Sequence, residues 1–414
     1  MKIRIYAPYY PFPISEGAFQ TIGDQIRTFL EQGHEVELVL ILETAESLQT
    51  KIKQASTQER ELPFQIVLLT SRTLATSQHQ SKSSKRSLRV VQSLFSTLSS
   101  PELFYYPPQL ANRSFLGEVD LAIYHYGFSY SWLKNGELSG EKKTAVFFHN
   151  LESDLYLLRS RMEKNPIKRW IHHLNYKKLK HHERLLANLC HEIWFVSPVD
   201  QKAYTQLNGI SETHPFRLTS PTYSPDLHRA RTQSFQSRLP SHSDTVYLGM
   251  VGGLDFQPNH DSAQWIIENL APLLLEKNFG GKILFVGKNA TSDLLKKAKP
   301  YPFIEFLGFV PDLETIWNKL SFMLVPHISG SGVRMKLLES LASAIPALAN
   351  TDAICRIHPG LQKSPFVIHC QSPKQWVQKI LEEKPYQTRN SLQQYPLAPE
   401  LLGKTIYQFL KPGK

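Results

Sequence analysis

The feature that most constrains the fold is an alternation of strand-sized apolar runs with helical segments along both halves of the chain. In the first half, a short strand and a Pro/Gly-rich turn precede a helix over 18–32, which Gly33 ends. Such alternation predicts parallel strands joined by right-handed crossovers, and therefore a doubly wound α/β sheet. The strands expected in this half are 2–7, 34–42, 64–70, 120–126, 144–149 and 192–197.

The length of the chain predicts two such domains. It has 414 residues, more than the roughly 250–300 at which a single hydrophobic core stops growing. A stretch rich in Ser, Arg, His and Pro at 224–244 indicates a linker. We expect a first domain over 1–235 and a second over 236–397, both Rossmann-like and facing a central cleft, with a helix near 398–414 that packs back on the first. The strands expected in the second domain are 246–251, 282–286, 303–307, 322–326, 345–349 and 366–370.

Composition and motifs exclude several classes of protein. Hydrophobic residues make up 41% of the chain and charged residues 20%, as in globular rather than disordered chains. No apolar run reaches the ~18–20 residues of a membrane span, and no signal peptide begins the chain, so a cytoplasmic protein is expected. Cys190, Cys355 and Cys370 match no disulfide framework or zinc motif, so no metal site is expected. The absence of G-x-G-x-x-G after the first strand, of a P-loop and of a G-x-S-x-G elbow disfavours oxidoreductases, ATPases and hydrolases.

The most informative stretch is 322–341. A buried strand, FMLVP, leads through HISGSGV into a helix, RMKLLESLA. Ligands of open α/β sheets bind at the carboxyl ends of strands, and a glycine-rich turn before a helix offers backbone N–H groups to a phosphate. Gly330 and Gly332 allow close backbone approach, and Ser331 adds a hydroxyl donor. The pattern predicts a phosphate-binding turn.

Three charged residues at the start of this helix extend the prediction to a nucleotide. Arg334 and Lys336 place cations where the helix dipole alone favours acids, which indicates a bound anion. Glu339 lies among leucines and is expected to be partly buried. It stands roughly 7–8 Å beyond Arg334 along the helix, at about 1.5 Å per residue, which suits a ribose whose diphosphate is held at Arg334. The alternative is an ordinary strand–loop–helix with a solvated Glu–Lys face.

The run PHISGSGVRMKLLESLASAIPALAN resembles the donor-site signature of GT-B glycosyltransferases, in particular the retaining group related to glycosyltransferase family 4. Three further segments of the second half resemble the same family in the same order: VGGLDFQPNHDSAQW, FVGKNA and FLGFVPDLETIW. In the first half, PISEGAFQ, EQGHEVELV, FFHNLESDL and HEIWFVSPVD resemble segments of its first domain. The resemblance implies a GT-B fold and transfer of a sugar from a nucleoside-diphosphate sugar, with retention and without a bound metal or other cofactor.

The resemblance implies a donor site in the second domain. Arg334 and Lys336 would hold the diphosphate as catalytic residues, and Glu339 would take the ribose hydroxyls. Phe309 and Val310 would border the nucleobase. The other residues implied in donor binding are Gly330, Ser331, Gly332, Val333, Gly252 and Gly253.

A smaller set is implied in the first domain. Glu16 and Gly17, in the loop after the first strand, would face the donor phosphate or the acceptor. His149, at the carboxyl end of a predicted strand, would face the transferred sugar as a catalytic residue. On its own, a histidine at such a position is equally well a hydrogen-bonded core residue. Asn150 and Glu152 are weaker candidates, because Glu152 can simply be a first-turn acid favoured by the helix dipole.

Two departures from the family pattern bear on the donor. Ser331 stands where many relatives carry a glutamate that contacts the donor sugar. The arginine usual in the loop after the first strand of the second domain is replaced by GGLD, so Arg334 and Lys336 would have to supply its charge. A degenerate, inactive enzyme is therefore an alternative.

Basic segments suggest a further partner. Lys and Arg number 47 against 36 acids, a net charge of +11, which attracts phosphates. The segment 159–184 interleaves its cations with apolar residues, and its four histidines show no metal-ligand spacing. It is open to three interpretations: a solvated helix packed on its own sheet, a basic amphipathic helix on an anionic membrane, or, least favoured, a nucleic-acid-binding helix. QSKSSKRSLR at 80–89 is a second basic candidate.

Together these observations favour a glycosyltransferase that acts on a nucleotide sugar and a glycan or lipid-linked acceptor, cytoplasmic or peripheral on the inner face of a membrane. Nucleic acid is an unlikely partner. The alternatives are a GT-B-fold sugar-nucleotide epimerase, a non-catalytic nucleotide-sugar sensor and a nucleic-acid-binding protein. A sensor would bind a nucleotide sugar without consuming it, and nucleic-acid binding would depend steeply on salt.

Overall fold

The computed structural model describes residues 1–12, 17–41, 43–68, 117–127, 129–130, 140–209, 216–218, 245–343 and 345–382. The chain divides into two compact units, Met1–Thr222 and Tyr223–Lys414. The expected domain boundary at 235, the basic segment 80–89 and the terminal helix near 398–414 lie outside the described residues. The central cleft between the two domains stays a prediction.

The first domain contains a seven-stranded sheet in the order β3-β2-β1-β4-β5-β6-β7, in which every pair of neighbours is parallel. This is the doubly wound order, with β7 added at one edge. The strands are β1 (Lys2–Ala7), β2 (Glu35–Leu40), β3 (Gln65–Leu68), β4 (Val119–His125), β5 (Glu141–Phe148), β6 (Glu192–Phe195) and β7 (Phe216–Leu218). The six strands predicted from the sequence are confirmed, whereas the three-residue β7 was not predicted.

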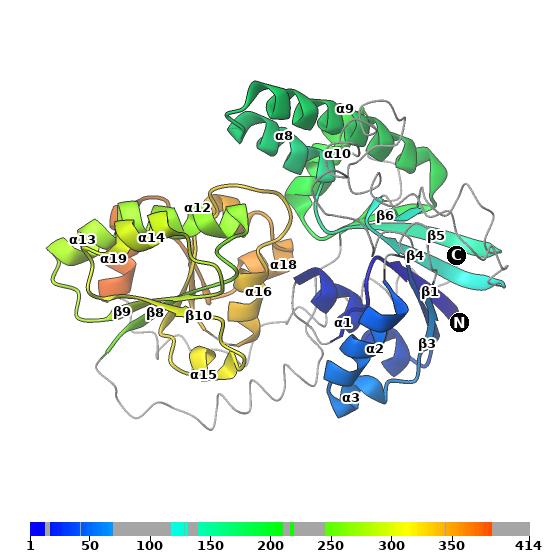
Figure 1. Cartoon of the computed structure of the whole chain (residues 1–414), viewed down its shortest axis with the longest axis horizontal. Coiled ribbons are helices and arrows are strands. Elements are labelled where there is room, and N and C mark those ends of the chain that lie inside the picture. Colours follow the sequence, from blue (N-terminus) through cyan, green and yellow to red (C-terminus); the bar gives the residue numbers. More distant parts are fainter. Residues whose placement is uncertain are drawn as a thin grey trace. The chain divides into compact units, whose positions relative to one another are not determined.

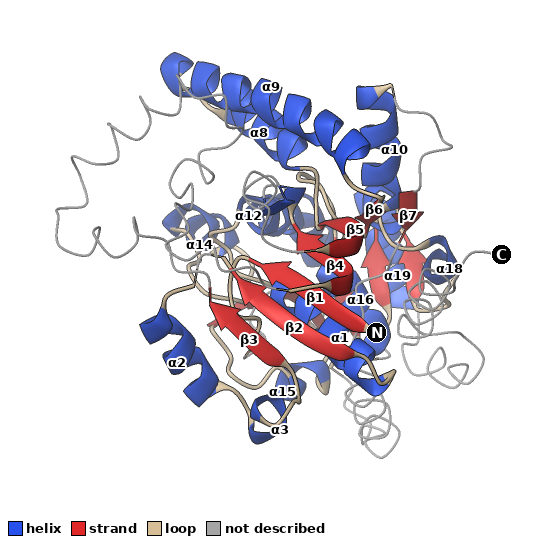
Figure 2. Cartoon of the chain, turned by 90° about the vertical axis from the view of Figure 1, so that its right-hand side faces the viewer, coloured by secondary structure: helices blue, strands red, loops and turns tan. Residues whose placement is uncertain are grey.

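Helix α1 (Gly17–Glu31) confirms the helix predicted after the first strand. Its apolar residues Ile22, Ile26 and Phe29 are completely buried. The chain turns out of the helix at Gly33, whose φ of +76° is the left-handed conformation that glycine adopts at helix ends. The other helices of this domain are α2 (Ala45–Gln54), α3 (Thr57–Arg60), α8 (Glu152–Met162), α9 (Pro166–Leu189) and α10 (Pro198–Asn208). Figure 2 shows α2 and α3 beside the β3 edge of the sheet.

The second domain contains a six-stranded parallel sheet in the order β10-β9-β8-β11-β12-β13, again the doubly wound order. Its strands are β8 (Tyr247–Val251), β9 (Lys282–Val286), β10 (Ile304–Gly308), β11 (Phe322–Val325), β12 (Ala347–Ala349) and β13 (Val367–His369). All six were predicted from their apolar runs. The chain therefore has two Rossmann-like sheets, and the predicted fold class is confirmed.

Helices connect the strands of the second domain, and the loops between strands and helices lie at the ends of the sheet (Figure 1). The predicted helix over 259–276 is observed as α12 (Gln257–Trp265), a π-helical turn (Ile266–Leu270) and α13 (Ala271–Glu276). The others are α14 (Ser292–Ala298), α15 (Glu314–Trp317), α16 (Met335–Ala342), α17 (Thr351–Ile354), α18 (Pro359–Gln362) and α19 (Pro373–Glu382). β11 is completely buried, and it is followed by α16, so the intervening loop lies at the carboxyl end of a central strand. In the part of the chain that the structure describes, no helix is long and apolar enough to cross a membrane.

Candidate functional site

The loop between β11 and α16 has the backbone geometry that its glycines predict. Gly330 has a φ of +96° and Gly332 a φ of +76°, both in the left-handed region that side chains rarely adopt. Space also requires glycine at 330, because a Cβ there would lie 2.9 Å from Cγ of Pro258 and 3.1 Å from Nη2 of Arg334. The loop is thus held closely against the start of α12.

The two predicted cations lie at the N-terminus of α16. Arg334 is the N-cap residue and Lys336 the second residue of the helix. Each is only 9% exposed. The Arg334 guanidinium donates a hydrogen bond to the carbonyl oxygen of Ser331 at 2.8 Å. The Lys336 amine donates to Oδ1 of Asn259 at 2.6 Å. The acceptors in these two hydrogen bonds are neutral groups.

Asn259 connects segments that the sequence analysis treated separately. Its side-chain oxygen accepts from Lys336, and its Nδ2 donates to the carbonyl oxygen of Gly253 at 3.0 Å. A Cβ at Gly252 would approach this amide to 2.6 Å, and the φ of +140° at Gly252 is again unsuited to a side chain. The glycines after β8 and the cation of α16 therefore meet at one asparagine. Sequence reasoning missed it, although Asn259 stands in the quoted segment VGGLDFQPNHDSAQW.

Burial changes the chemistry of Lys336. Loss of solvation, reinforced by the positive charge of Arg334, lowers the pKa of the Lys336 amine to about 7, while the Glu339 carboxylate acts in the opposite direction. A buried amine with such a pKa gains its charge readily when an anion approaches. The site therefore favours a ligand that brings negative charge to the N-terminus of α16.

A buried histidine adjoins the same cations. His327 is 6% exposed and is the second residue after β11. Its backbone is fixed by Asn350, which accepts from the His327 N–H at 3.0 Å and donates to its carbonyl at 2.8 Å. Burial lowers the pKa of His327, and the charges of Arg334, Arg356 and Lys336 lower it further. A third cation, Arg356, thus acts at this site. Arg356 follows α17 in the sequence, and no motif pointed to it.

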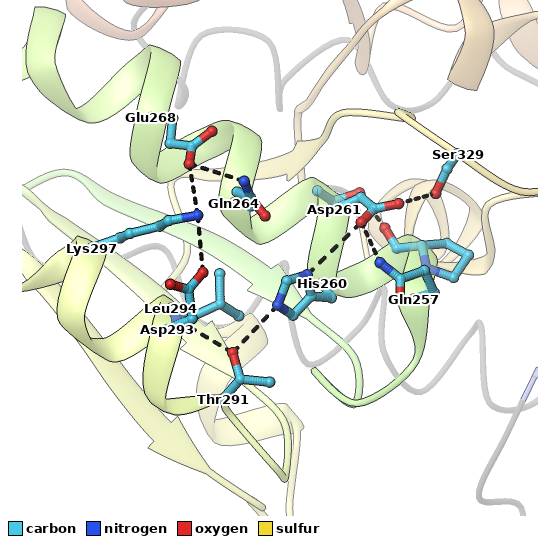
Figure 3. Close-up of polar contacts among 12 residues, drawn as sticks. Gln257, His260, Asp261, Gln264, Glu268, Thr291, Asp293, Leu294, Lys297 and Ser329 are labelled. Carbon is cyan, nitrogen blue, oxygen red and sulfur yellow. Dashed lines mark hydrogen bonds and ion pairs between the residues drawn. The ribbon is translucent and has the colours of Figure 1, made fainter. Parts of the chain in front are cut away.

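The loop is also connected to the first turns of α12 through a polar network (Figure 3). The Ser329 hydroxyl donates to Oδ2 of Asp261, and Gln257 donates to the other oxygen of this carboxylate at 2.6 Å. The Ser262 hydroxyl lies 2.7 Å from the carbonyl of Pro326. These contacts hold the first part of the loop, from Pro326 to Ser329, against α12.

The remaining predicted donor residues surround this centre at different depths. Phe309, after β10, is 74% exposed, whereas Val310 packs partly against the core. An exposed ring in the loop after a strand is suited to stacking on a flat ligand. Gly332 is buried, while Ser331, Val333 and Glu339 are half-buried. The half-burial of Glu339 confirms the expectation for that carboxylate.

The first domain has its own group of polar residues at the carboxyl ends of β4 and β5. His149 follows β5, and its Nε2 lies 3.0 Å from Nδ1 of His125, the last residue of β4. The other nitrogen of His125 lies 3.1 Å from Oε1 of Gln25 on α1. Sequence reasoning found His149 but missed Gln25 and His125. Gly17 is the first residue of α1, whereas Glu16 lies outside the described residues.

This chain of side chains couples the tautomers of the two histidines. With Oε1 of Gln25 as the acceptor, His125 carries its proton on Nε2 and accepts at Nδ1. His149 therefore donates from Nε2, which leaves its Nδ1 as an acceptor. Burial lowers the pKa of His149 to about 3, and burial together with the neighbouring His149 lowers that of His125. Both rings are neutral at physiological pH, so His149 can accept a hydrogen bond.

Among the described residues, no three His, Cys, Asp or Glu side chains come together as a metal site would require. The prediction of a metal-free reaction itself stays untested.

The comparisons with known proteins agree with this geometry. Residues 245–382, which carry the loop, both cations and Asn259, match the family model of the glycosyl transferases group 1. Among curated protein sequences, none matches this chain.

Solved structures share the fold over both domains. TarM matches with a TM-score of 0.64 and 11% identity, over 99% of this chain and 99% of TarM. WaaG, a glycosyltransferase involved in lipopolysaccharide biosynthesis, matches with a TM-score of 0.61 and 14% identity, over 99% of this chain and 100% of WaaG. HepE from Anabaena, in complex with UDP-glucose, matches with a TM-score of 0.55 and 10% identity, over 99% of both chains.

The second domain is therefore a group 1 glycosyltransferase domain, and the chain as a whole has the GT-B fold of glycosyltransferases. The resemblance noted in the sequence is confirmed by the family model over the second domain and by the solved structures in the fold of the whole chain.

The neutral histidines of the first domain predict how its stability depends on pH. Below pH ~6.5 the unfolded chain protonates its histidines, whereas His149 resists protonation in the folded domain until the pH nears 3. The free energy of unfolding should therefore decrease as the pH is lowered from about 6.5 towards 3. The decrease should be up to about 1.4 kcal/mol per pH unit for each such histidine. Urea denaturation of His149→Gln should show about 1–2 kcal/mol less loss than wild type between pH 7 and pH 5.

His173→Gln is the matched control, because His173 is exposed on the surface of the same domain. It should leave the pH dependence as in wild type. Equal losses in His149→Gln and wild type would show that His149 takes up its proton without cost, contrary to the buried arrangement.

Proposed function

We propose that the protein transfers a sugar from a nucleoside-diphosphate sugar to a glycan or glycolipid acceptor, with the donor diphosphate bound at the N-terminus of α16. The observation that carries the proposal is the burial of Arg334 and Lys336 beside the loop of Gly330 and Gly332 in a glycosyltransferase domain. Burying a cation costs free energy, and a bound diphosphate would offset that cost. It would also accept hydrogen bonds from the backbone N–H groups of the loop.

In this proposal catalysis is electrostatic. Negative charge develops on the diphosphate as its bond to the sugar breaks, and Arg334, Lys336 and the helix N-terminus stabilise that charge. The acceptor hydroxyl can give its proton to the departing phosphate, so no dedicated base is needed. Retention of configuration and independence of a metal belong to the proposal through the family resemblance. Domain closure would exclude water from the reaction.

Other residues are proposed to orient the donor. Glu339 lies along α16 from the two cations and would accept hydrogen bonds from the ribose hydroxyls. The exposed ring of Phe309 would stack on the nucleobase, bordered by Val310. In the first domain, the Nδ1 acceptor of His149 would face a hydroxyl of the transferred sugar, and the segment of Glu16 and Gly17 would face the phosphate or the acceptor.

The chemistry of the structural relatives supports a nucleotide donor. A TarM variant from S. aureus was solved with UDP and alpha-GlcNAc-glycerol, at a TM-score of 0.61 and 10% identity over 99% of this chain and 100% of TarM. HepE was solved with UDP and with UDP-glucose. These complexes make uridine diphosphate sugars the first donors to test. The same proposal places the protein in the cytoplasm, with a lipid-linked acceptor at an anionic membrane surface.

A GT-B-fold epimerase is the other enzymatic candidate, and it would consume its nucleotide sugar without any acceptor. A nucleotide-sugar sensor would bind the donor and leave it intact. Ser331 stands in place of the family's glutamate, a change that would suit a sensor which binds the donor without reacting with it. Product analysis with and without acceptor therefore separates the three functions.

Arg334→Ala should reduce turnover by roughly 10²- to 10³-fold, as expected for loss of one group that stabilises the transition state. The measurement is the release of nucleoside diphosphate from a panel of nucleotide sugars in the presence of glycan and glycolipid acceptors. Lys319→Ala, which removes an exposed cation of the same domain, should leave turnover unchanged. Turnover within threefold of wild type in Arg334→Ala would remove this residue from the mechanism.

Lys336 gives the binding step a pH signature. A bound diphosphate raises the pKa of the amine above the value of about 7 in the free protein. At pH 8 the free amine is mostly neutral and the bound amine charged, so binding should take up about one proton. Affinity should accordingly fall as the pH rises above 7. Calorimetry in buffers of different ionisation enthalpy measures the uptake.

Lys336→Arg provides the comparison, because a guanidinium stays charged in both states. It should bind the same nucleoside diphosphate without the proton uptake. A wild-type protein that binds the nucleotide at pH 8 with no proton uptake would show that Lys336 does not meet the diphosphate.

A further inference from the structure

The tip of the hairpin formed by α8 and α9 is a surface that the transfer reaction does not use. α8 ends at Met162, and α9 begins at Pro166 after a connection of three residues. The two helices run side by side from this tip, as Figure 1 and Figure 2 show. The tip lies within the basic segment 159–184, for which the sequence left three interpretations open.

Large apolar side chains are exposed at this tip. Ile167 is 69% exposed, Trp170 is 54% exposed and Met162 is 47% exposed. Ile167 and Trp170 are three residues apart in a helix, so their side chains lie on the same face of its first turn. Among the exposed large hydrophobic residues of the described chain, only Phe309 is more exposed than Ile167. A tryptophan and an isoleucine in such positions favour a non-aqueous partner.

The same tip is strongly basic. Its exposed cations, which together with Met162, Ile167 and Trp170 we call the hairpin-tip surface, are Arg161, Lys164, Lys168 and Arg169. The single acid between them is Glu163, whose side chain accepts a hydrogen bond from the backbone N–H of Asn165 at 2.9 Å. Four cations against one acid give the surface a positive field, so its partner should be anionic.

The backbone of the tip is well defined. Asn165 caps α9, with Oδ1 accepting from the N–H groups of Ile167 at 3.0 Å and Lys168 at 3.1 Å. Pro166 occupies the first helical position, where its fixed φ suits the helix. Arg169 donates from Nε to the carbonyl oxygen of Glu163 at 3.0 Å. The apolar side chains are therefore presented on a rigid turn.

The remainder of α9 shows that ordinary packing does not account for the tip. Asn175, Leu179, Glu183 and Leu186 are buried and follow one another at helical spacing. Glu183 accepts hydrogen bonds from both the N–H and the hydroxyl of Ser153 at the start of α8. The helix thus packs on its own domain over its second half, whereas every residue from 166 to 170 is exposed.

We propose that the hairpin-tip surface docks on an anionic lipid bilayer. The cations bring the tip to the negative surface, and Ile167, Trp170 and Met162 enter the region between headgroups and acyl chains, where tryptophan is favoured. This docking is a peripheral attachment by one helical turn. The docking names the part of the first domain that would meet the membrane surface of the proposed function. It is argued from exposure and charge alone, and vesicle binding tests it separately from sugar transfer.

The test is co-sedimentation of the full chain with vesicles of phosphatidylglycerol and phosphatidylcholine, and with vesicles of phosphatidylcholine alone. Wild type should bind the anionic vesicles at low salt and should bind the neutral vesicles at least about tenfold less strongly. The double variant Ile167→Ser with Trp170→Ser should bind the anionic vesicles about tenfold less strongly than wild type or weaker. Lys168→Glu with Arg169→Glu should lose binding to a similar extent.

The matched control is Leu185→Ser with Leu189→Ser. These two leucines are 43% and 44% exposed at the other end of α9, so the control removes apolar surface from the same helix away from the tip. It should bind as wild type. Thermal unfolding and nucleotide binding of each variant report on folding and on the donor site separately from vesicle binding.

Three results would overturn the proposal: no binding of wild type to anionic vesicles, equal binding by wild type and the tip variants, or an equal loss in the leucine control. Binding of single-stranded RNA by wild type that the tip variants lose, without vesicle binding, would assign the surface to nucleic acid instead.

Discussion

The hydrogen bond between the buried amine of Lys336 and the side chain of Asn259 is the contact on which the donor-site account depends. It connects the N-terminus of α16 to the first turn of α12, and through the second hydrogen bond of Asn259 to the glycines after β8. The segments that follow two neighbouring strands, β8 and β11, are held together in this way. The amide of Asn259 is neutral, so this hydrogen bond orients the Lys336 amine without supplying a counter-charge.

The two domains use the same topology for different chemistry. In the second domain, cations are buried at the start of a helix that follows β11, and burial brings the pKa of one of them to about 7. In the first domain, His125 and His149 follow β4 and β5, and burial keeps both rings neutral. A cationic site suits a leaving diphosphate, whereas a neutral hydrogen-bonding site suits the hydroxyls of a sugar. The doubly wound order places each group at the carboxyl ends of central strands.

Much of this arrangement was predictable from sequence, for identifiable reasons. β11 is a continuous apolar run, and Gly330 and Gly332 indicate a turn into a helix, so the strand and the loop could be predicted. Asn259 could not be found in this way, because its role depends on Lys336, which is 77 residues away in the sequence. The strand β7 has only three residues, which is too few for an apolar pattern. Arg356 follows α17 and acts on His327 through its charge, which no sequence motif indicates.

A diphosphate site at the N-terminus of α16 is tested most directly by thermal unfolding with UDP, GDP, ADP, dTDP and CMP, carried out on wild type, Arg334→Ala and Lys319→Ala. We expect a nucleoside diphosphate to stabilise wild type and Lys319→Ala, by about 2.7 kcal/mol at 100 times its Kd. Arg334→Ala should gain far less at the same concentration. No stabilisation of wild type by any of these nucleotides, or equal stabilisation of Arg334→Ala, would contradict a diphosphate site at the N-terminus of α16.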